Sequence, residues 1–132
     1  MVSLLCFIPY SAAAAYNGRV QRTVSVVNLS AIAHNARYLR GLCRGATFMA
    51  VVKADAYGHG AEAVAQALSD DALLFAVSSV GEGARLRAAG IGKDILVLTP
   101  LLSDEDALRA GYYDLIAAAA SAESLALAAG LR

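Results

Sequence analysis

Apolar and polar positions alternate along this chain in a regular rhythm of strand-like and helix-like segments. Runs rich in apolar and β-branched residues predict strands at 19–29, 47–53, 73–80, 95–98 and 115–119. Apolar residues at helical spacing predict helices at 31–44, 61–68, 81–89, 103–112 and 121–131. Ser30 and Ser103 are the candidate N-caps of two of these helices, and three acidic residues follow Ser103 in the first helical turn. At roughly twenty to twenty-five residues per unit, the alternation predicts about five strand–helix units forming a parallel sheet covered by helices.

Two α/β architectures fit this alternation, a doubly wound sheet and a (β/α) barrel. A full barrel takes roughly 200–250 residues, whereas the chain has 132. If the fold is a barrel, we therefore expect only its first part here.

Charge and cysteine content exclude several classes of protein. The chain has eleven basic and eleven acidic residues, which disfavours nucleic-acid binding and polybasic membrane-surface binding. Its high apolar content disfavours disorder. Cys6 and Cys43 are far apart, as are His34 and His59, so we predict no disulfide framework and no metal site.

The first residues form a separate segment. Residues 2–15 are nearly all apolar and end in Ala13-Ala14-Ala15, which resembles the hydrophobic part of a signal peptide and its cleavage site. No basic residue precedes them, and Pro9 interrupts them. We predict that residues 1–18 are an extension of a cytoplasmic protein; the alternative is export through a signal peptide.

The stretch 48–60 carries the strongest chemical signal. Its apolar run predicts a strand buried on both faces, with Met49, Val51 and Lys53 sharing one face. Lys53 would then point inward at the carboxyl end of the strand, where α/β folds bind ligands. A partly desolvated amine at that position is a usable nucleophile.

Three interpretations of this stretch compete. Residues 58–63 match the dinucleotide fingerprint G-x-G-x-x-A, with Glu82 further along, but four residues separate Lys53 from Gly58 where the fingerprint needs a direct connection. Alternatively, Lys53 forms a Schiff base with a cofactor, and Tyr57 supplies a hydrogen bond to its phosphate. In the third interpretation Lys53 merely ends a strand in a surface loop.

Residues 50–61, Ala-Val-Val-Lys-Ala-Asp-Ala-Tyr-Gly-His-Gly-Ala, resemble the pyridoxal-phosphate attachment motif of the alanine racemase family. The segments 27–35, 80–91 and 95–98 are similar to the family's first helix, next helix and next strand, with Asn28 where the family more often has Asp. This resemblance covers about residues 24–132. It implies the first part of the (β/α)8 TIM-type barrel of fold-type III pyridoxal-phosphate enzymes, with 19–132 as the N-terminal portion of the barrel domain.

The resemblance also implies roles for three residues. Lys53 matches the lysine that binds pyridoxal 5'-phosphate and moves the Cα proton on one face of the substrate. Tyr57 matches the tyrosine that bonds the cofactor phosphate, and Leu98 matches a leucine of the cofactor pocket. The implied function is interconversion of L- and D-alanine by a cytoplasmic homodimer, which supplies D-alanine for peptidoglycan.

The family places its second catalytic base, a tyrosine, in a C-terminal domain that contacts the partner subunit's site. Racemisation needs acid–base groups on both faces of a planar carbanion, so we expect the chain by itself, as a fragment, to have little or no racemase activity. The alternative function is a non-catalytic pyridoxal-phosphate-binding barrel of the cofactor-homeostasis type, which shares the strand-ending lysine but resembles residues 51–60 less well.

Other polar residues receive structural interpretations. We predict that His59 is a loop residue, exposed or bonded to the backbone, and that Asp55 caps the loop or is solvated, although pairing with Lys53 stays open. Glu82 with Arg85 or Arg87 predicts a solvated ion-pair face. Tyr112 and Tyr113 predict packing at a helix end.

Overall fold

The structure, a computed structural model, describes residues 25–130. Its four parallel strands lie in the order β1-β2-β3-β4, so each strand pairs with its neighbour in sequence. They are β1 (Met49–Val51), β2 (Leu74–Val77), β3 (Asp94–Val97) and β4 (Ile116–Ala117). The helices are α1 (Leu29–Leu42), α2 (Lys53–Gly58), α3 (Ala61–Leu68), α4 (Val80–Ala88), α5 (Asp104–Tyr112) and α6 (Ala122–Ala129).

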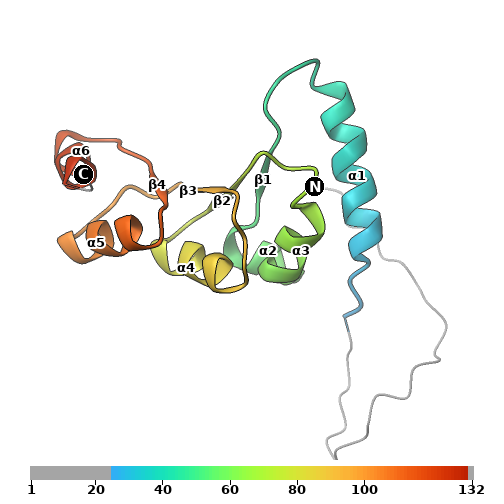
Figure 1. The fold of residues 1–132 in the computed structure, drawn as a ribbon, viewed down its shortest axis with the longest axis horizontal. Helices are drawn as coiled ribbons and strands as arrows, with labels where there is room; N and C mark the ends of the chain where they lie inside the picture. The colour runs from blue at the N-terminus through green and yellow to red at the C-terminus, as the bar shows by residue number, and fades with distance from the viewer. Residues whose placement is uncertain (1–24, 131–132) are drawn as a thin grey trace, which may run out of the picture.

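The helices that connect the strands lie on one side of the sheet. Helices α3, α4 and α5 lie below the strands in Figure 1, while α1 flanks β1 and α6 lies beyond β4. A doubly wound sheet reverses its strand order and carries helices on both faces. Consecutive strand order with helices on one face is instead the arrangement of successive barrel units.

Strand register sorts the side chains into rows across the sheet. Phe75 pairs with Ala50 and Ile95, and Val77 pairs with Val97, all on the covered face. These side chains are at most 7% exposed. Burying one large aliphatic or aromatic side chain contributes about 1.5–3 kcal/mol, so the rows beneath the helices form the core.

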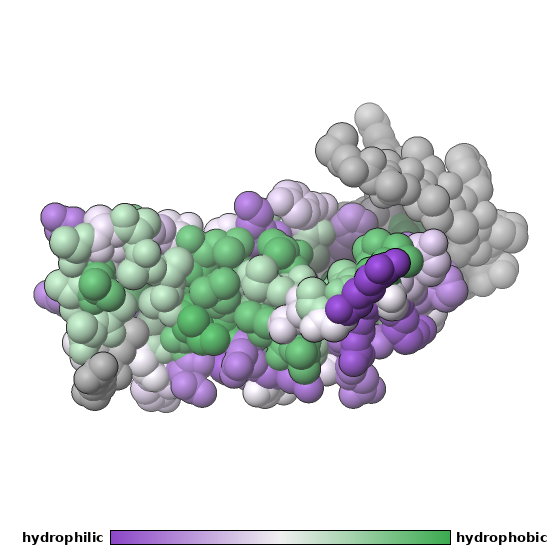
Figure 2. All heavy atoms as spheres, turned by 90° about the horizontal axis from the view of Figure 1, so that it is seen from above, coloured by the Kyte–Doolittle hydropathy of each residue, from purple (hydrophilic) through white to green (hydrophobic). Residues whose placement is uncertain are grey.

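The opposite face of the sheet is open and apolar. Met49, Val51, Leu98 and Ile116 are 36–45% exposed there, and Figure 2 shows the apolar surface that lies over the strands. The prediction that the strand at 47–53, which corresponds to β1, is buried on both faces is therefore wrong within residues 25–130. Helices cover only one side of the sheet, and no other described strand closes over the open face.

Serine side chains begin three of the helices. The Oγ atoms of Ser79, Ser103 and Ser121 accept hydrogen bonds from backbone N–H groups three residues later, at 3.1–3.2 Å. An N-cap of this kind stabilises a helix by about 1 kcal/mol. The predicted cap at Ser103 is confirmed, and these serines fix where α4, α5 and α6 start relative to the strands before them.

The prediction for the region before α1 is wrong in its described part. Residues 25–28 form no strand, and α1 begins at Leu29. Asn28, rather than Ser30, is the N-cap, because its Oδ1 accepts the N–H of Ala31 at 3.0 Å. Residues 19–24 of the predicted strand, and the extension predicted at 1–18, lie outside the described residues. No helix within residues 25–130 is long and apolar enough to cross a membrane.

Candidate active site

Lys53 and Leu98 lie at the same level across the sheet, at its carboxyl edge. The N–H of Val52 donates to the carbonyl of Ala76 at 2.9 Å, and the N–H of Leu98 donates to that of Val77 at 2.8 Å. The parallel ladder therefore continues one residue beyond β1 and β3. Lys53 comes next along the chain and lies level with Leu98, at the edge where α/β proteins bind ligands.

The backbone after Lys53 turns in the left-handed sense. Ala54, Asp55, Ala56 and Tyr57 all have φ of 50–55° and ψ of 39–47°, where the sequence predicted only a loop. The left-handed helical conformation costs roughly 1–2 kcal/mol per residue for side chains other than glycine. Four such residues in succession must be held by their surroundings.

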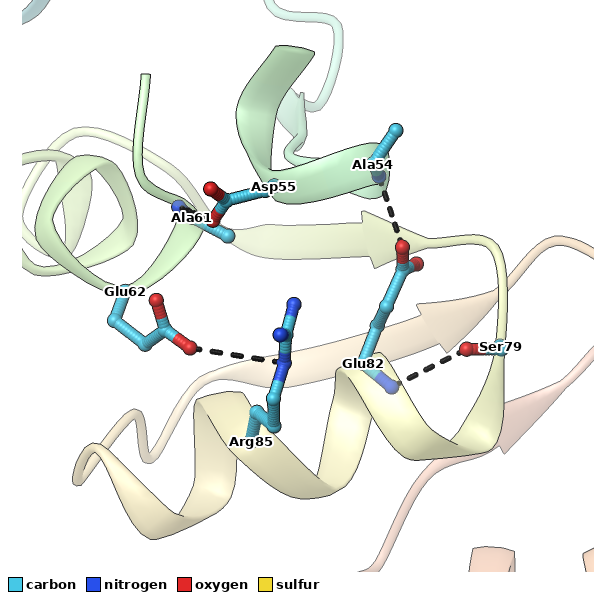
Figure 3. A network of polar contacts seen from close by, with 7 residues as sticks. All are labelled: Ala54, Asp55, Ala61, Glu62, Ser79, Glu82 and Arg85. Atoms are coloured by element: carbon cyan, nitrogen blue, oxygen red, sulfur yellow. Dashed lines mark hydrogen bonds and ion pairs between the residues drawn. The ribbon is translucent and has the colours of Figure 1, made fainter. Parts of the chain in front are cut away.

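Hydrogen bonds to neighbouring elements hold this left-handed turn (Figure 3). The N–H of Ala54 donates to Glu82 Oε1 at 2.9 Å, and Asp55 Oδ1 accepts the N–H of Ala61 at 2.8 Å. Within the backbone, the N–H of Ala56 donates to Val52 O at 2.9 Å. The turn is thus tied to α4 at its start and to α3 through its second residue.

The three side chains predicted to meet a cofactor differ in exposure. Lys53 is half-buried, Leu98 is 38% exposed and Tyr57 is 69% exposed. Lys53 and Tyr57 belong to the same short turn, α2, whereas Leu98 lies two strands away along the row of Lys53. An amine, a phenol hydroxyl and an apolar side chain are thereby presented at one edge of the sheet.

The structure also decides the roles of two polar neighbours. Asp55 caps the start of α3 through Ala61, so the capping role is confirmed, and neither ion pair of residues 25–130 joins it to Lys53. His59 is exposed, and its Nδ1 lies 2.8 Å from the carbonyl oxygen of Ala56. The prediction of a loop histidine bonded to the backbone is confirmed.

The predicted ion-pair face on α4 is wrong for Glu82 and Arg87. Glu82 bonds the backbone of Ala54 and, through Oε2, the N–H of Ser78 at 2.6 Å. Arg87 donates to four carbonyl oxygens between Ile91 and Asp114 at 2.6–2.9 Å. Of the two arginines in α4, Arg85 alone forms an ion pair, an exposed one with Glu62 at 3.7 Å.

The sequence contained a local signal that the side chain of Glu82 reaches back past the start of α4. Ser79 and Glu82 stand in the S-x-x-E spacing of a capping box, in which the glutamate reaches back past the start of its helix. Ser79 Oγ does accept the N–H of Glu82 at 3.2 Å. The carboxylate reaches the N–H of Ser78 instead of the cap residue, which leaves its other oxygen for Ala54.

Comparison with known sequences identifies relatives for most of the described chain. Residues 27–132 match the family "Alanine racemase, N-terminal domain". Alanine racemase of Nitratidesulfovibrio vulgaris (strain DP4) is 49% identical over 83 residues, which are 62% of this chain and 22% of that protein. Alanine racemase of Mycobacterium ulcerans (strain Agy99) is 55% identical over 73 residues, or 54% and 19% of the two chains. The matched segments therefore span about a fifth of these relatives' length.

Solved structures of alanine racemases share the fold. The biosynthetic alanine racemase from Pseudomonas aeruginosa superposes with a TM-score of 0.73 and 37% identity, covering 80% of this chain and 29% of that one. Alanine racemase from Bacillus anthracis with bound L-Ala-P gives a TM-score of 0.71 and 34% identity, covering 80% and 28%. The fold class predicted from the sequence, an incomplete part of a TIM-type barrel, is confirmed. With a family match over residues 27–132, the chain belongs to the family of the alanine racemase N-terminal domain.

Proposed function

We propose that this chain is the cofactor-binding part of a pyridoxal-phosphate-dependent alanine racemase, with Lys53 as the residue that binds the cofactor covalently. The observation that carries the proposal is the position of Lys53 at the carboxyl edge of the parallel sheet, level with Leu98 and followed by the turn that ends near Tyr57. Further support comes from the relatives, which are named alanine racemases, and from the Bacillus anthracis structure, which contains bound L-Ala-P.

The residues at this edge fit the chemical groups of pyridoxal phosphate. A primary amine reacts with the cofactor's aldehyde, and Lys53, which carries one, is a half-buried residue at the carboxyl edge of the sheet. The exposed hydroxyl of Tyr57 is a donor suited to a phosphate oxygen. Leu98 offers apolar surface to a planar ring, and it lies on the same face as Val51.

When bound, pyridoxal phosphate supplies an electron sink that stabilises negative charge at the substrate Cα. Within this chain, Lys53 Nζ would accept or donate the Cα proton on one face. Tyr57 would hold the phosphate through its hydroxyl. Leu98 would offer apolar surface to the ring. Racemisation also requires an acid–base group on the opposite face, and we assign that role to none of the described residues.

The biological part of the proposal follows from the product. D-alanine would serve peptidoglycan synthesis, and the complete enzyme would act on free alanine as a homodimer in the cytoplasm. The first experiment, however, concerns only the covalent site.

The two lysines of the chain provide an internal control. Lys53 lies at the carboxyl edge of the sheet, and exposed Lys93 precedes β3 at the other edge. The chain is incubated with pyridoxal phosphate, reduced with borohydride and mapped by peptide mass spectrometry. We expect label on Lys53 well above that on Lys93, and its loss in Lys53→Ala but not in Lys93→Ala. Equal labelling of both lysines would refute the proposal.

A further inference from the structure

Glu82 joins three parts of the chain that meet beside Lys53. It lies in the first turn of α4, and its two carboxylate oxygens accept different backbone N–H groups. Oε1 accepts from Ala54, the first residue of the left-handed turn, at 2.9 Å. Oε2 accepts from Ser78, the residue that follows β2, at 2.6 Å. One side chain therefore fixes the position of the turn relative to the end of the neighbouring strand.

The hydrogen bond from Ala54 to Glu82 lies at the point where the backbone changes from strand to left-handed turn. Val52 completes the ladder of β1, and the left-handed conformation begins two residues later at Ala54. The direction in which Lys53 leaves the sheet therefore depends on how its two flanking peptide groups are held. The Val52–Lys53 peptide accepts the N–H of Ala56 through Val52 O at 2.9 Å, and the N–H of the Lys53–Ala54 peptide donates to the carboxylate of Glu82. Hydrogen bonds to an ionised acceptor are roughly twice as strong as neutral ones.

Figure 3 also shows why this role falls to Glu82 rather than to its neighbours. Glu62 of α3 points to Arg85 at 3.7 Å in an exposed ion pair, a kind of contact that contributes little. Asp55 holds the turn through Ala61, but on the side of α3 and one residue further from Lys53. Glu82 is the side chain that bonds the peptide N–H directly after Lys53.

We propose that Glu82 is a positioning residue that orients Lys53 for covalent attachment of the cofactor by fixing the peptide between Lys53 and Ala54. This inference rests on the proposed function of Lys53. It assigns to Glu82, an acidic side chain that accepts two backbone N–H groups, a measurable effect on the reactivity of the Lys53 amine.

The test compares Glu82→Gln with Glu62→Gln. Glu82→Gln keeps the size of the side chain but replaces one acceptor oxygen with an NH2 group, which is only a donor. The side chain can then no longer accept hydrogen bonds from both N–H groups with separate oxygens. The second makes the same chemical change at a glutamate of the same network that lies in the exposed ion pair. Both are compared with the unmodified 132-residue chain.

The first readout needs no cofactor. Amide hydrogen exchange is measured at Ala54 and Ser78, and at Leu98, whose N–H donates to Val77 within the sheet. We expect exchange at Ala54 or Ser78 to rise about tenfold or more in Glu82→Gln, with Leu98 unchanged and no rise in Glu62→Gln. A rise of the same size at Leu98 would mean that the whole sheet has loosened and would overturn a positioning role.

The second readout is the rate at which Lys53 is labelled. The Lys53 amine bonds to the cofactor's aldehyde carbon with loss of water, and borohydride then adds hydride to the C=N bond and makes the link permanent. We expect slower labelling of Lys53 in Glu82→Gln, with the rate at Lys93 unchanged. If the unmodified chain labels Lys53 preferentially and Glu82→Gln labels it equally fast, the positioning role alone fails. If the unmodified chain shows no preference for Lys53, the proposed function fails first.

Discussion

Replacing Ala54 with glycine should stabilise the chain, although the same replacement elsewhere in a helical segment weakens it. Ala54 has φ of 51° and ψ of 47° and is exposed. Glycine adopts this left-handed conformation without the steric cost that a Cβ introduces. The matched control is Ala63→Gly, at an exposed position of the right-handed helix α3.

The two opposing terms give the expected magnitude. Removing the Cβ relieves roughly 1–2 kcal/mol of left-handed strain at Ala54. The greater freedom of glycine in the unfolded chain costs about 0.5–1 kcal/mol. We therefore expect Ala54→Gly to raise the free energy of unfolding by about 0.5–1 kcal/mol. Ala63→Gly has only the unfavourable term and should lower it by about 0.5–1 kcal/mol.

Urea denaturation followed by far-UV circular dichroism measures both changes. Because the urea midpoint equals the free energy of unfolding divided by the m-value, the two variants should shift this midpoint in opposite directions. The variants are compared at a common m-value, which limits the error of extrapolation. If Ala54→Gly destabilises the chain as much as Ala63→Gly does, the turn is not left-handed at Ala54 and the reasoning is refuted.

Two further pairs of variants test contacts of α4. Arg87→Ala removes four hydrogen bonds to backbone carbonyls and should lower the free energy of unfolding by about 2–4 kcal/mol. Arg85→Ala breaks an exposed ion pair and should lower it by at most about 1 kcal/mol. Equal losses in the two variants would contradict the structural role of Arg87. Gly83→Ala would place a Cβ 2.7 Å from a methyl carbon of Leu115 and should be less stable by about 1–3 kcal/mol than Gly81→Ala, whose site has room. Urea midpoints measure both pairs, and equal stabilities for the two alanine variants would argue against close packing at Gly83.

The strand faces and helix starts could be predicted because they depend on residues that are adjacent in the sequence. Alternation of side chains along residues 48–53 assigned Ala50 and Val52 to one face and Met49 and Val51 to the other, and the structure confirms this by their burial. Ser103 and the three acidic residues after it likewise identified a helix start from four adjacent residues, and the cap at Ser103 is present. In each case the residues that decide the structure are neighbours in the sequence.

The support of the site was not predictable in the same way. Glu82 and Ala54 are 28 residues apart, and Arg87 reaches carbonyl groups up to 27 residues away. Helical spacing suggested an ion-pair face for both, since it compares only neighbours on one helix. The left-handed turn was also missed, because alanine and tyrosine ordinarily favour right-handed backbone. Contacts with α3 and α4 hold that turn in place. The S-x-x-E spacing signals that Glu82 reaches back past the start of α4, but no local pattern identifies Ala54 as its partner.

The consecutive order of the strands has a consequence for how the chain is made. Because β1 pairs with β2, β2 with β3, and β3 with β4, each strand finds its partner in the unit synthesised just before it. Contacts between sequence neighbours require only short loop closures, which favours rapid folding. The sheet can therefore grow one strand at a time as the chain leaves the ribosome, and among the strands of residues 25–130 the one that leads into Lys53 is the first to be made.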